Sequence, residues 1–193
     1  GILLDGDQIM SICAHYLLQK GCLTKQQMVV TSMSNLGLKL AMEKDNIRVF
    51  EAQVGDRYVL AKMLEIGAVM GGEQSGHIIF SEYNTTGDGL VSALMLLSIM
   101  QETGKSLKEL AKIMVKMPQV LMNVPVKNKA WQESNAMLEA VKRAEQILAG
   151  SGRVLVRPSG TESLIRIMTE GPELTMLQEI IQEIAATASK ELN

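Results

Sequence analysis

One short segment of the chain concentrates side chains that can hold a phosphate group. Residues 157–162 read Arg-Pro-Ser-Gly-Thr-Glu and directly follow an apolar run at 154–156, which places them at the end of a predicted strand. Arg157 offers a planar fork that can donate to two phosphate oxygens. Ser159 and Thr161 add hydroxyl donors. The segment is therefore a candidate phosphate-binding loop.

The same segment also suits an ordinary turn. Gly160 lets the backbone bend so that successive N–H groups can point at one anion. A polar turn between two strands has a similar composition, with Ser and Thr bonding to their own backbone. Glu162 favours that alternative, because a carboxylate repels phosphate unless it points away. The residues alone leave both interpretations open.

A second polar segment, 71–77, reads Gly-Gly-Glu-Gln-Ser-Gly-His. If it is extended, Glu73, Ser75 and His77 point to one side, since side chains two apart on a strand share a face. A carboxylate, a hydroxyl and an imidazole would then face the hydroxyl groups of a sugar. The alternative is a polar hairpin whose glycines serve only the turn and whose histidine is structural.

A third segment, Val54-Gly55-Asp56-Arg57, follows a predicted strand. In an α/β domain the loops after the strands form the ligand crevice, so Gly55, Asp56 and Arg57 are candidate ligand contacts. The alternative is structural: Asp56 caps the next helix and Arg57 pairs with a nearby carboxylate.

The order of elements predicts how these segments are positioned. Strands alternate with helices in the first part of the chain, which predicts an α/β domain with a mainly parallel mixed sheet. Asp7 is expected to cap the first helix, and the Met-rich segment 90–100 is expected to lie in the core. The expected strands are 27–33, 47–53, 68–72 and 77–81, and the expected helices are 7–20, 36–44, 57–66 and 89–103.

The pattern changes near Pro118 and Pro125, where the helical period ends. We expect a domain boundary and a candidate hinge at about 120–126. Strands that are adjacent in sequence, with helices beside them, predict a smaller α+β domain with an antiparallel sheet. Its expected strands are 121–127, 153–157 and 163–170, and its expected helices are 131–148 and 173–190.

Composition narrows the class of protein. The formal net charge is -2, with 19 basic and 21 acidic residues, which argues against a nucleic-acid or membrane-surface binder. Cys13 and Cys22 have the spacing of neither a zinc site nor a disulfide framework and indicate reduced thiols in a cytoplasmic protein. The longest apolar stretch, 90–100, is too short to span a bilayer.

Taken together, the segments resemble the α-D-phosphohexomutase superfamily. GEQSGH at 72–77 looks like that family's sugar-binding loop, and RPSGTE at 157–162 looks like its phosphate-binding loop. VGDRYV at 54–59 and NTTGDG at 84–89 point to the branch that acts on glucosamine phosphates. DGDQIM at 5–10 is similar to the segment after the family's metal loop, and the resemblance covers essentially the whole chain.

The resemblance implies a four-domain enzyme that interconverts 6-phospho and 1-phospho sugars through a sugar bisphosphate. A phosphorylated serine in domain 1 donates the phosphoryl group, and Mg²⁺ sits on a DGDxDR-type loop in domain 2. Residues 1–24 would be the end of domain 2, 25–120 the sugar-binding domain 3 and 121–193 the phosphate-binding domain 4. The missing domains 1 and 2 would be partners of this C-terminal fragment.

The same resemblance assigns roles to residues. Sugar binding falls to Glu73, Ser75 and His77, with Gly55, Asp56 and Arg57 at the sugar's edge. Phosphate binding falls to Arg157, Ser159, Gly160 and Thr161. It assigns neither a nucleophile nor a metal ligand to this chain. Ser163 departs from the family pattern, which usually has Pro there, and we expect this difference to loosen the exit from the phosphate loop.

The expected activity is the interconversion of glucosamine 6-phosphate and glucosamine 1-phosphate by the whole enzyme, with this chain inactive alone. We expect its two binding loops to face one cleft. Two alternatives remain: a branch that acts on mannose or glucose phosphates, and a non-catalytic module that binds phosphosugars with the same loops.

Overall fold

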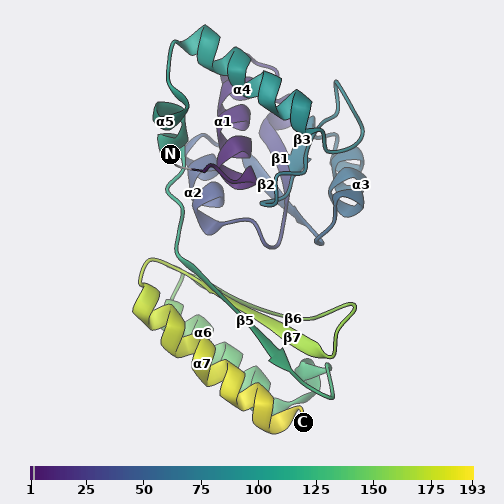
Figure 1. The fold of residues 1–193 in the computed structure, drawn as a ribbon, viewed down its shortest axis with the longest axis vertical. Helices are drawn as coiled ribbons and strands as arrows, with labels where there is room; N and C mark the ends of the chain where they lie inside the picture. The colour runs from purple at the N-terminus through teal and green to yellow at the C-terminus, as the bar shows by residue number, and fades with distance from the viewer. Residues whose placement is uncertain (2) are drawn as a thin grey trace. The chain divides into compact units, whose positions relative to one another are not determined.

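The computed structural model describes residues 1 and 3–193. The chain forms two compact units, Gly1–Lys116 and Met117–Asn193 (Figure 1). The first contains a mainly parallel mixed sheet and the second an antiparallel sheet of three strands, so the predicted fold class is confirmed.

The sheet of the first unit has the strand order β2-β1-β3-β4. Its strands are β1 (Gln27–Thr31), β2 (Arg48–Ala52), β3 (Met70–Gly72) and β4 (Ile78–Phe80). Strand β1 pairs in parallel with β2 and with β3, and β3 pairs antiparallel with β4. The carboxyl ends of β1, β2 and β3 therefore meet at one edge, where α/β sheets place their ligand loops.

Helices cover both faces of this sheet. They are α1 (Gly6–Gln19), α2 (Leu36–Lys44), α3 (Asp56–Ile66), α4 (Gly89–Thr103) and α5 (Leu107–Leu110), with short 3-10 turns at Thr24–Gln26 and Ala111–Ile113. Alternate residues of β1 point to opposite sides: Met28 and Val30 pack with α1 and α2, and Val29 packs with Val59 and Met63 of α3. This alternation is the period of a strand that is buried on both faces.

The prediction that Asp7 caps the first helix is wrong. Asp5 is the N-cap, with extended backbone angles, and forms a capping box with Gln8. Asp7 lies inside the helix and is fully buried, and its carboxylate accepts a hydrogen bond from the backbone N–H of Asn35 at 2.7 Å. Capping needs the residue just before the first helical turn, and that residue is Asp5.

Helix α1 packs inside the first unit. Its residues Met10, Ile12 and Cys13 belong to the same hydrophobic cluster as β1 and α2. The helix therefore contributes directly to the core beneath the sheet. The assignment of residues 1–24 to the end of domain 2, which the resemblance implied, stays a prediction.

Helix α4 begins and ends as predicted, with Asp88 as N-cap and Gly104 in the left-handed region. The prediction that its apolar residues lie in the core holds for one side only: Ile99 is buried and Met95 and Met100 pack against the core. On the other side, Leu90, Leu94 and Leu97 are 70%, 57% and 59% exposed. This helix is apolar nearly all round, and packing on α1 covers only one side of it.

The second unit is a three-stranded sheet with two long helices on one face (Figure 1). Its elements are β5 (Gln119–Pro125), α6 (Asn135–Leu148), β6 (Arg153–Pro158), β7 (Leu164–Glu170) and α7 (Leu174–Glu191), in the sheet order β5-β7-β6. The helix predicted at 131–148 is split, because a 3-10 turn occupies Trp131–Glu133 and Ser134 caps α6.

The expected hinge at 120–126 is not found there. Nearly all of that segment belongs to β5, which pairs with β7 along its whole length, from Gln119 opposite Glu170 to Pro125 opposite Leu164. A fully paired strand cannot act as a hinge without breaking its ladder.

Within the described residues, no helix is long and apolar enough to cross a membrane.

Candidate functional site

The carboxyl edge of the first sheet brings two of the predicted segments together. Gly55 follows β2 and Glu73 follows β3. The backbone N–H of Gly55 donates to Oε1 of Glu73 at 3.0 Å. Glu73 is half-buried, so part of its carboxylate remains open to solvent at this edge. This hydrogen bond fixes the position of the carboxylate that we predicted from the sequence to bind sugar hydroxyls.

The segment that contains Glu73 is a hairpin turn and not an extended strand. Glu73 and His77 close it, with the N–H of Glu73 donating to the carbonyl of His77 at 3.0 Å. Gly76 has φ +100°, a backbone conformation that glycine adopts without strain. The interpretation based on strand alternation is therefore wrong, but the turn still places the Ser75 hydroxyl 3.2 Å from Nδ1 of His77, and both side chains are exposed.

The start of α1 holds this turn in place. The N–H of Gly6 donates to the carbonyl of Gln74 at 2.9 Å. A Cβ atom at position 6 would lie 2.2 Å from the carbonyl oxygen of Glu73, so no other residue fits without a shift of backbone. The sequence analysis did not single out this glycine, because its importance depends on a contact between distant segments.

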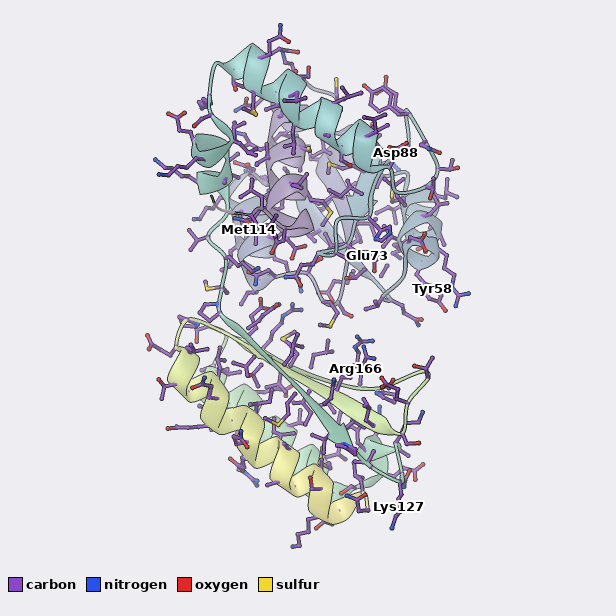
Figure 2. The ribbon with its side chains drawn as sticks, in the orientation of Figure 1. Tyr58, Glu73, Asp88, Met114, Lys127 and Arg166 are labelled. Carbon is purple, nitrogen blue, oxygen red and sulfur yellow. The ribbon has the colours of Figure 1, made fainter. Side chains whose placement is uncertain are left out.

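The loop before α3 presents Arg57. Gly55 is the N-cap of α3 and has φ +127°. Asp56 is therefore not the cap, and its carboxylate accepts from the N–H of Arg57 at 2.7 Å. Within the part of the chain that the structure describes, the Arg57 guanidinium has no carboxylate partner and instead donates to the hydroxyl of Tyr58 at 2.6 Å. Figure 2 labels Tyr58 and Glu73 at the same end of the first unit.

The predicted phosphate loop connects β6 and β7 in the second unit. Ser159 is buried, and its hydroxyl accepts from the N–H of Glu162 at 3.3 Å, as the ordinary-turn alternative expected. Gly160 and Thr161 are exposed at the tip. Lys129 braces the loop by donating to the carbonyl of Ser159 at 2.8 Å. The loop thus has a hydrogen bond within it at Ser159, an exposed tip, and the ammonium group of Lys129 nearby.

Two arginines lie directly opposite each other beside this loop. Arg157 of β6 pairs with Arg166 of β7, and both are half-buried. Burial lowers the pKa of Arg157, and the charge of Arg166 lowers it further. Like charges opposite each other destabilise a sheet. An anion bound between the two guanidinium groups would remove that repulsion.

Both arginines point away from the helices of the second unit. Their strand neighbours Val156, Ile165 and Ile167 pack in the cluster with α6 and α7, so alternation turns the arginines to the open face. The Nε atom of Arg166 is buried and has no hydrogen-bond partner among the described residues, and its NH2 group donates to Glu162 at 3.2 Å. Sequence reasoning missed Arg166. The alternation of apolar and polar residues at 164–168 indicates which face of the sheet the Arg166 side chain lies on, but only the strand register places it opposite Arg157.

The described residues do not fit the magnesium site that the resemblance implies for the whole enzyme. No group of three His, Cys, Asp or Glu side chains among them is placed to hold a metal ion. Asp5 caps α1 and pairs with Lys116 at 2.6 Å, and Asp7 accepts from Asn35. These carboxylates already have structural partners, so we assign no metal ligand to them.

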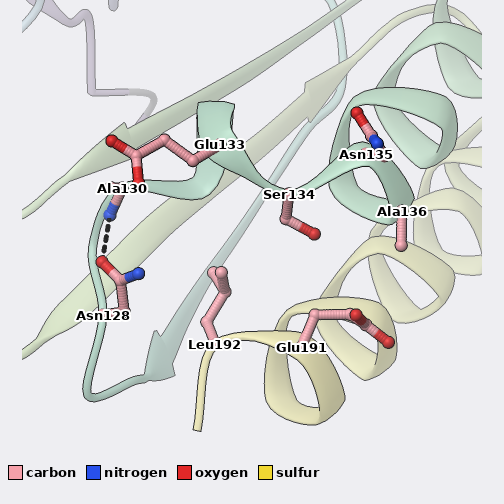
Figure 3. A pocket seen from close by; sticks show the side chains of 8 residues that line it. All are labelled: Asn128, Ala130, Glu133, Ser134, Asn135, Ala136, Glu191 and Leu192. Atoms are coloured by element: carbon pink, nitrogen blue, oxygen red, sulfur yellow. Dashed lines mark hydrogen bonds between the residues drawn. The ribbon is translucent and has the colours of Figure 1, made fainter.

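A further hollow in the second unit is unrelated to the candidate residues. It measures about 570 Å³ and lies at the start of α6 and the end of α7 (Figure 3). The carboxylates of Glu133 and Glu191 at its wall would repel a phosphate group. Its lining consists of Asn128, Ala130, Glu133, Ser134, Asn135, Ala136, Glu191 and Leu192.

Comparison with protein-family models gives two matches that together cover most of the chain. Residues 5–117 match the phosphoglucomutase/phosphomannomutase alpha/beta/alpha domain III. Residues 121–187 match the C-terminal domain of the same family. The two matches fall on the two compact units of the structure.

Curated relatives are similar over nearly the whole chain. The phosphoglucosamine mutase of Desulforamulus reducens is 56% identical over 186 residues, which is 96% of this chain and 42% of the relative. That of Clostridium novyi is 52% identical over 196 residues, 100% of this chain and 44% of the relative. The chain therefore spans less than half the length of these relatives.

Solved structures share the fold. The N-acetylphosphoglucosamine mutase of Aspergillus fumigatus, in complex with GlcNAc-6P and magnesium, has a TM-score of 0.84 and 18% identity. It is matched over 100% of this chain and 45% of its own. An N-acetylglucosamine-phosphate mutase in a product complex has a TM-score of 0.76 and 21% identity, over 95% of this chain and 44% of its own.

Proposed function

Because this chain belongs to the phosphoglucomutase/phosphomannomutase family, we propose that it forms the substrate-binding part of a phosphoglucosamine mutase. The whole protein would interconvert glucosamine 6-phosphate and glucosamine 1-phosphate through a phosphoserine and a sugar bisphosphate. The paired arginines, Arg157 and Arg166, carry this proposal, because two opposed cations beside an open polar loop suit a phosphate group.

We propose that each unit supplies its own kind of binding group for a phosphosugar. In the first unit, the Glu73 carboxylate would accept hydrogen bonds from sugar hydroxyls, and Ser75 and His77 would lie beside it. Charge-assisted hydrogen bonds of this kind are stronger than neutral ones. Arg57, on the neighbouring loop, would supply a cation at the edge of the sugar. Gly55 and Asp56 would shape that loop.

In the second unit, Arg157 and Arg166 would bind the phosphate group of the sugar that does not take part in the transfer step. Gly160 and Thr161 would add N–H and hydroxyl donors at the exposed tip of the loop. Ser159 would contribute mainly by holding the loop, since its hydroxyl already accepts from Glu162.

Phosphoryl transfer depends mostly on positioning and on stabilising charge, so binding groups of this kind contribute directly to the rate. The nucleophilic serine and the magnesium site of the proposed reaction would lie in parts of the protein that this chain does not cover. We derive no step through a metal bound to the residues described here.

The proposal is tested by comparing the whole protein with the 193-residue chain. The whole protein should convert glucosamine 6-phosphate faster than mannose or glucose phosphates, and the isolated chain should bind phosphosugars without turnover. Turnover by the isolated chain would show that its own residues suffice. A whole protein that prefers a non-amino sugar would favour the other branches, and one that only binds would favour the non-catalytic module.

A further inference from the structure

We infer that Tyr58 is a positioning residue that holds the guanidinium of Arg57 ready for the phosphosugar. The inference rests on the proposed function of this edge of the sheet. Tyr58 is not itself a predicted ligand contact, and it acts through its neighbour Arg57.

Two contacts join Tyr58 to Arg57. The guanidinium carbon lies 4.5 Å from the centroid of the tyrosine ring, within the range of a cation–π interaction. The same guanidinium donates to the tyrosine hydroxyl at 2.6 Å. A stack and a hydrogen bond together restrict a long side chain that would otherwise sample many rotamers.

The ring of Tyr58 also contacts the loop that positions Glu73. A Cβ atom at Gly55 would lie 3.3 Å from Cδ2 of Tyr58, so the ring rests against this glycine. Gly55 in turn donates to the carboxylate of Glu73. One aromatic ring therefore supports both a cation and the backbone that fixes the nearby carboxylate.

The arrangement keeps the positive charge of Arg57 available. Elsewhere Arg143 pairs with Glu183 and Arg153 pairs with Glu170, which neutralise those guanidinium groups. Tyr58 orients Arg57 without adding a negative charge. Its hydroxyl accepts the hydrogen bond, so its own proton can still be donated outward. Ordering such a side chain before binding reduces the entropy cost of binding.

The test uses the whole protein with Tyr58→Leu and Tyr58→Phe. Tyr58→Leu removes both contacts and should raise KM for glucosamine 6-phosphate by about tenfold, whereas Tyr58→Phe keeps the ring and should raise it about threefold. The value of kcat should change less, because the lost interaction acts on bound substrate and transition state alike. Tyr83→Leu is the matched control, since Tyr83 is also exposed and forms no cation–π contact with an arginine among the described residues.

A double-mutant cycle shows whether Tyr58 acts through Arg57. In an Arg57→Ala background, Tyr58→Leu should raise KM by clearly less than it does when Arg57 is present, since only the support of Gly55 is then left to lose. Equal effects of Tyr58→Leu with and without Arg57 would overturn the inference.

The same cycle can be measured as affinity for glucosamine 6-phosphate, by calorimetry, which needs no turnover. Coupling between the two residues in a protein that does not turn over glucosamine phosphates would reject the proposed function and keep the inference. Turnover of glucosamine phosphates without coupling between Tyr58 and Arg57 would keep the proposed function and reject the inference.

Discussion

At the scale of single residues, the chemistry proposed for this chain depends on two guanidinium charges that repel each other. Arg157 and Arg166 face each other across two strands, and their mutual repulsion raises the free energy of the ligand-free protein. Arg166 keeps one weak exposed pair with Glu162, over 3.2 Å. Such a pair contributes little, so it leaves most of the positive charge of the two arginines free for the anion that we propose they bind.

Arg157→Ala should weaken binding of glucosamine 6-phosphate by about 10- to 100-fold, because a charge-assisted contact is lost. The melting temperature should stay the same or rise slightly, since the repulsion from Arg166 is also removed. Calorimetry and thermal unfolding measure the two effects. Arg143→Ala is the control, because that exposed arginine pairs with Glu183 on the helical side. Equal affinity in Arg157→Ala and the unaltered protein would reject the phosphate assignment.

At the scale of elements, the candidate sugar site depends on how the start of α1 meets the β3–β4 turn. Gly6 donates to Gln74 and leaves no room for a side chain against Glu73. The helix is fixed one residue earlier by the capping box of Asp5 and Gln8. The turn that carries Glu73 is therefore positioned by a segment more than sixty residues away in the sequence, through one closely packed backbone contact.

Gly6→Ala should displace this turn, because the added Cβ would lie 2.2 Å from a backbone oxygen. We expect a loss of about 1–3 kcal/mol in the free energy of unfolding, the usual cost of overpacking, and a higher KM for the phosphosugar. Denaturant unfolding and steady-state kinetics measure both.

Gly89→Ala is the matched control for this change. Gly89 begins α4, and a Cβ atom there would meet nothing within 4 Å. It should be neutral or slightly stabilising, since Ala has less freedom than Gly in the unfolded chain. Equal effects at the two positions would show that the Gly6 contact does not matter.

At the scale of the whole molecule, two separate hydrophobic cores define two units. One cluster contains Met28 and Leu38, and the other contains Ile167 and Ile181. Each side of the junction is anchored to its own unit, because Lys116 pairs with Asp5 and the carbonyl of Pro118 accepts from Gly171. The chain therefore passes from one unit to the other within a very short segment.

Separate cores predict that the chain unfolds in two transitions. Ile167→Ala should lower the stability of one transition by about 2–5 kcal/mol, and Met28→Ala should lower the other by a similar amount. Both side chains are fully buried, so each change leaves a cavity. Calorimetric unfolding of the two variants measures this. A single transition that both substitutions shift equally would contradict it.

The sequence by itself determined the class of each sheet, most element positions and the identity of the polar segments, because these follow from local periodicity and turn chemistry. Only the tertiary structure decided which distant residues meet. Arg166 joins Arg157 through strand register, Gly6 meets Glu73 through the packing of α1, and Leu94 stays exposed because an apolar helix has more faces than its neighbours can cover. Such contacts depend on how elements pair and pack, and local patterns carry no information about that choice.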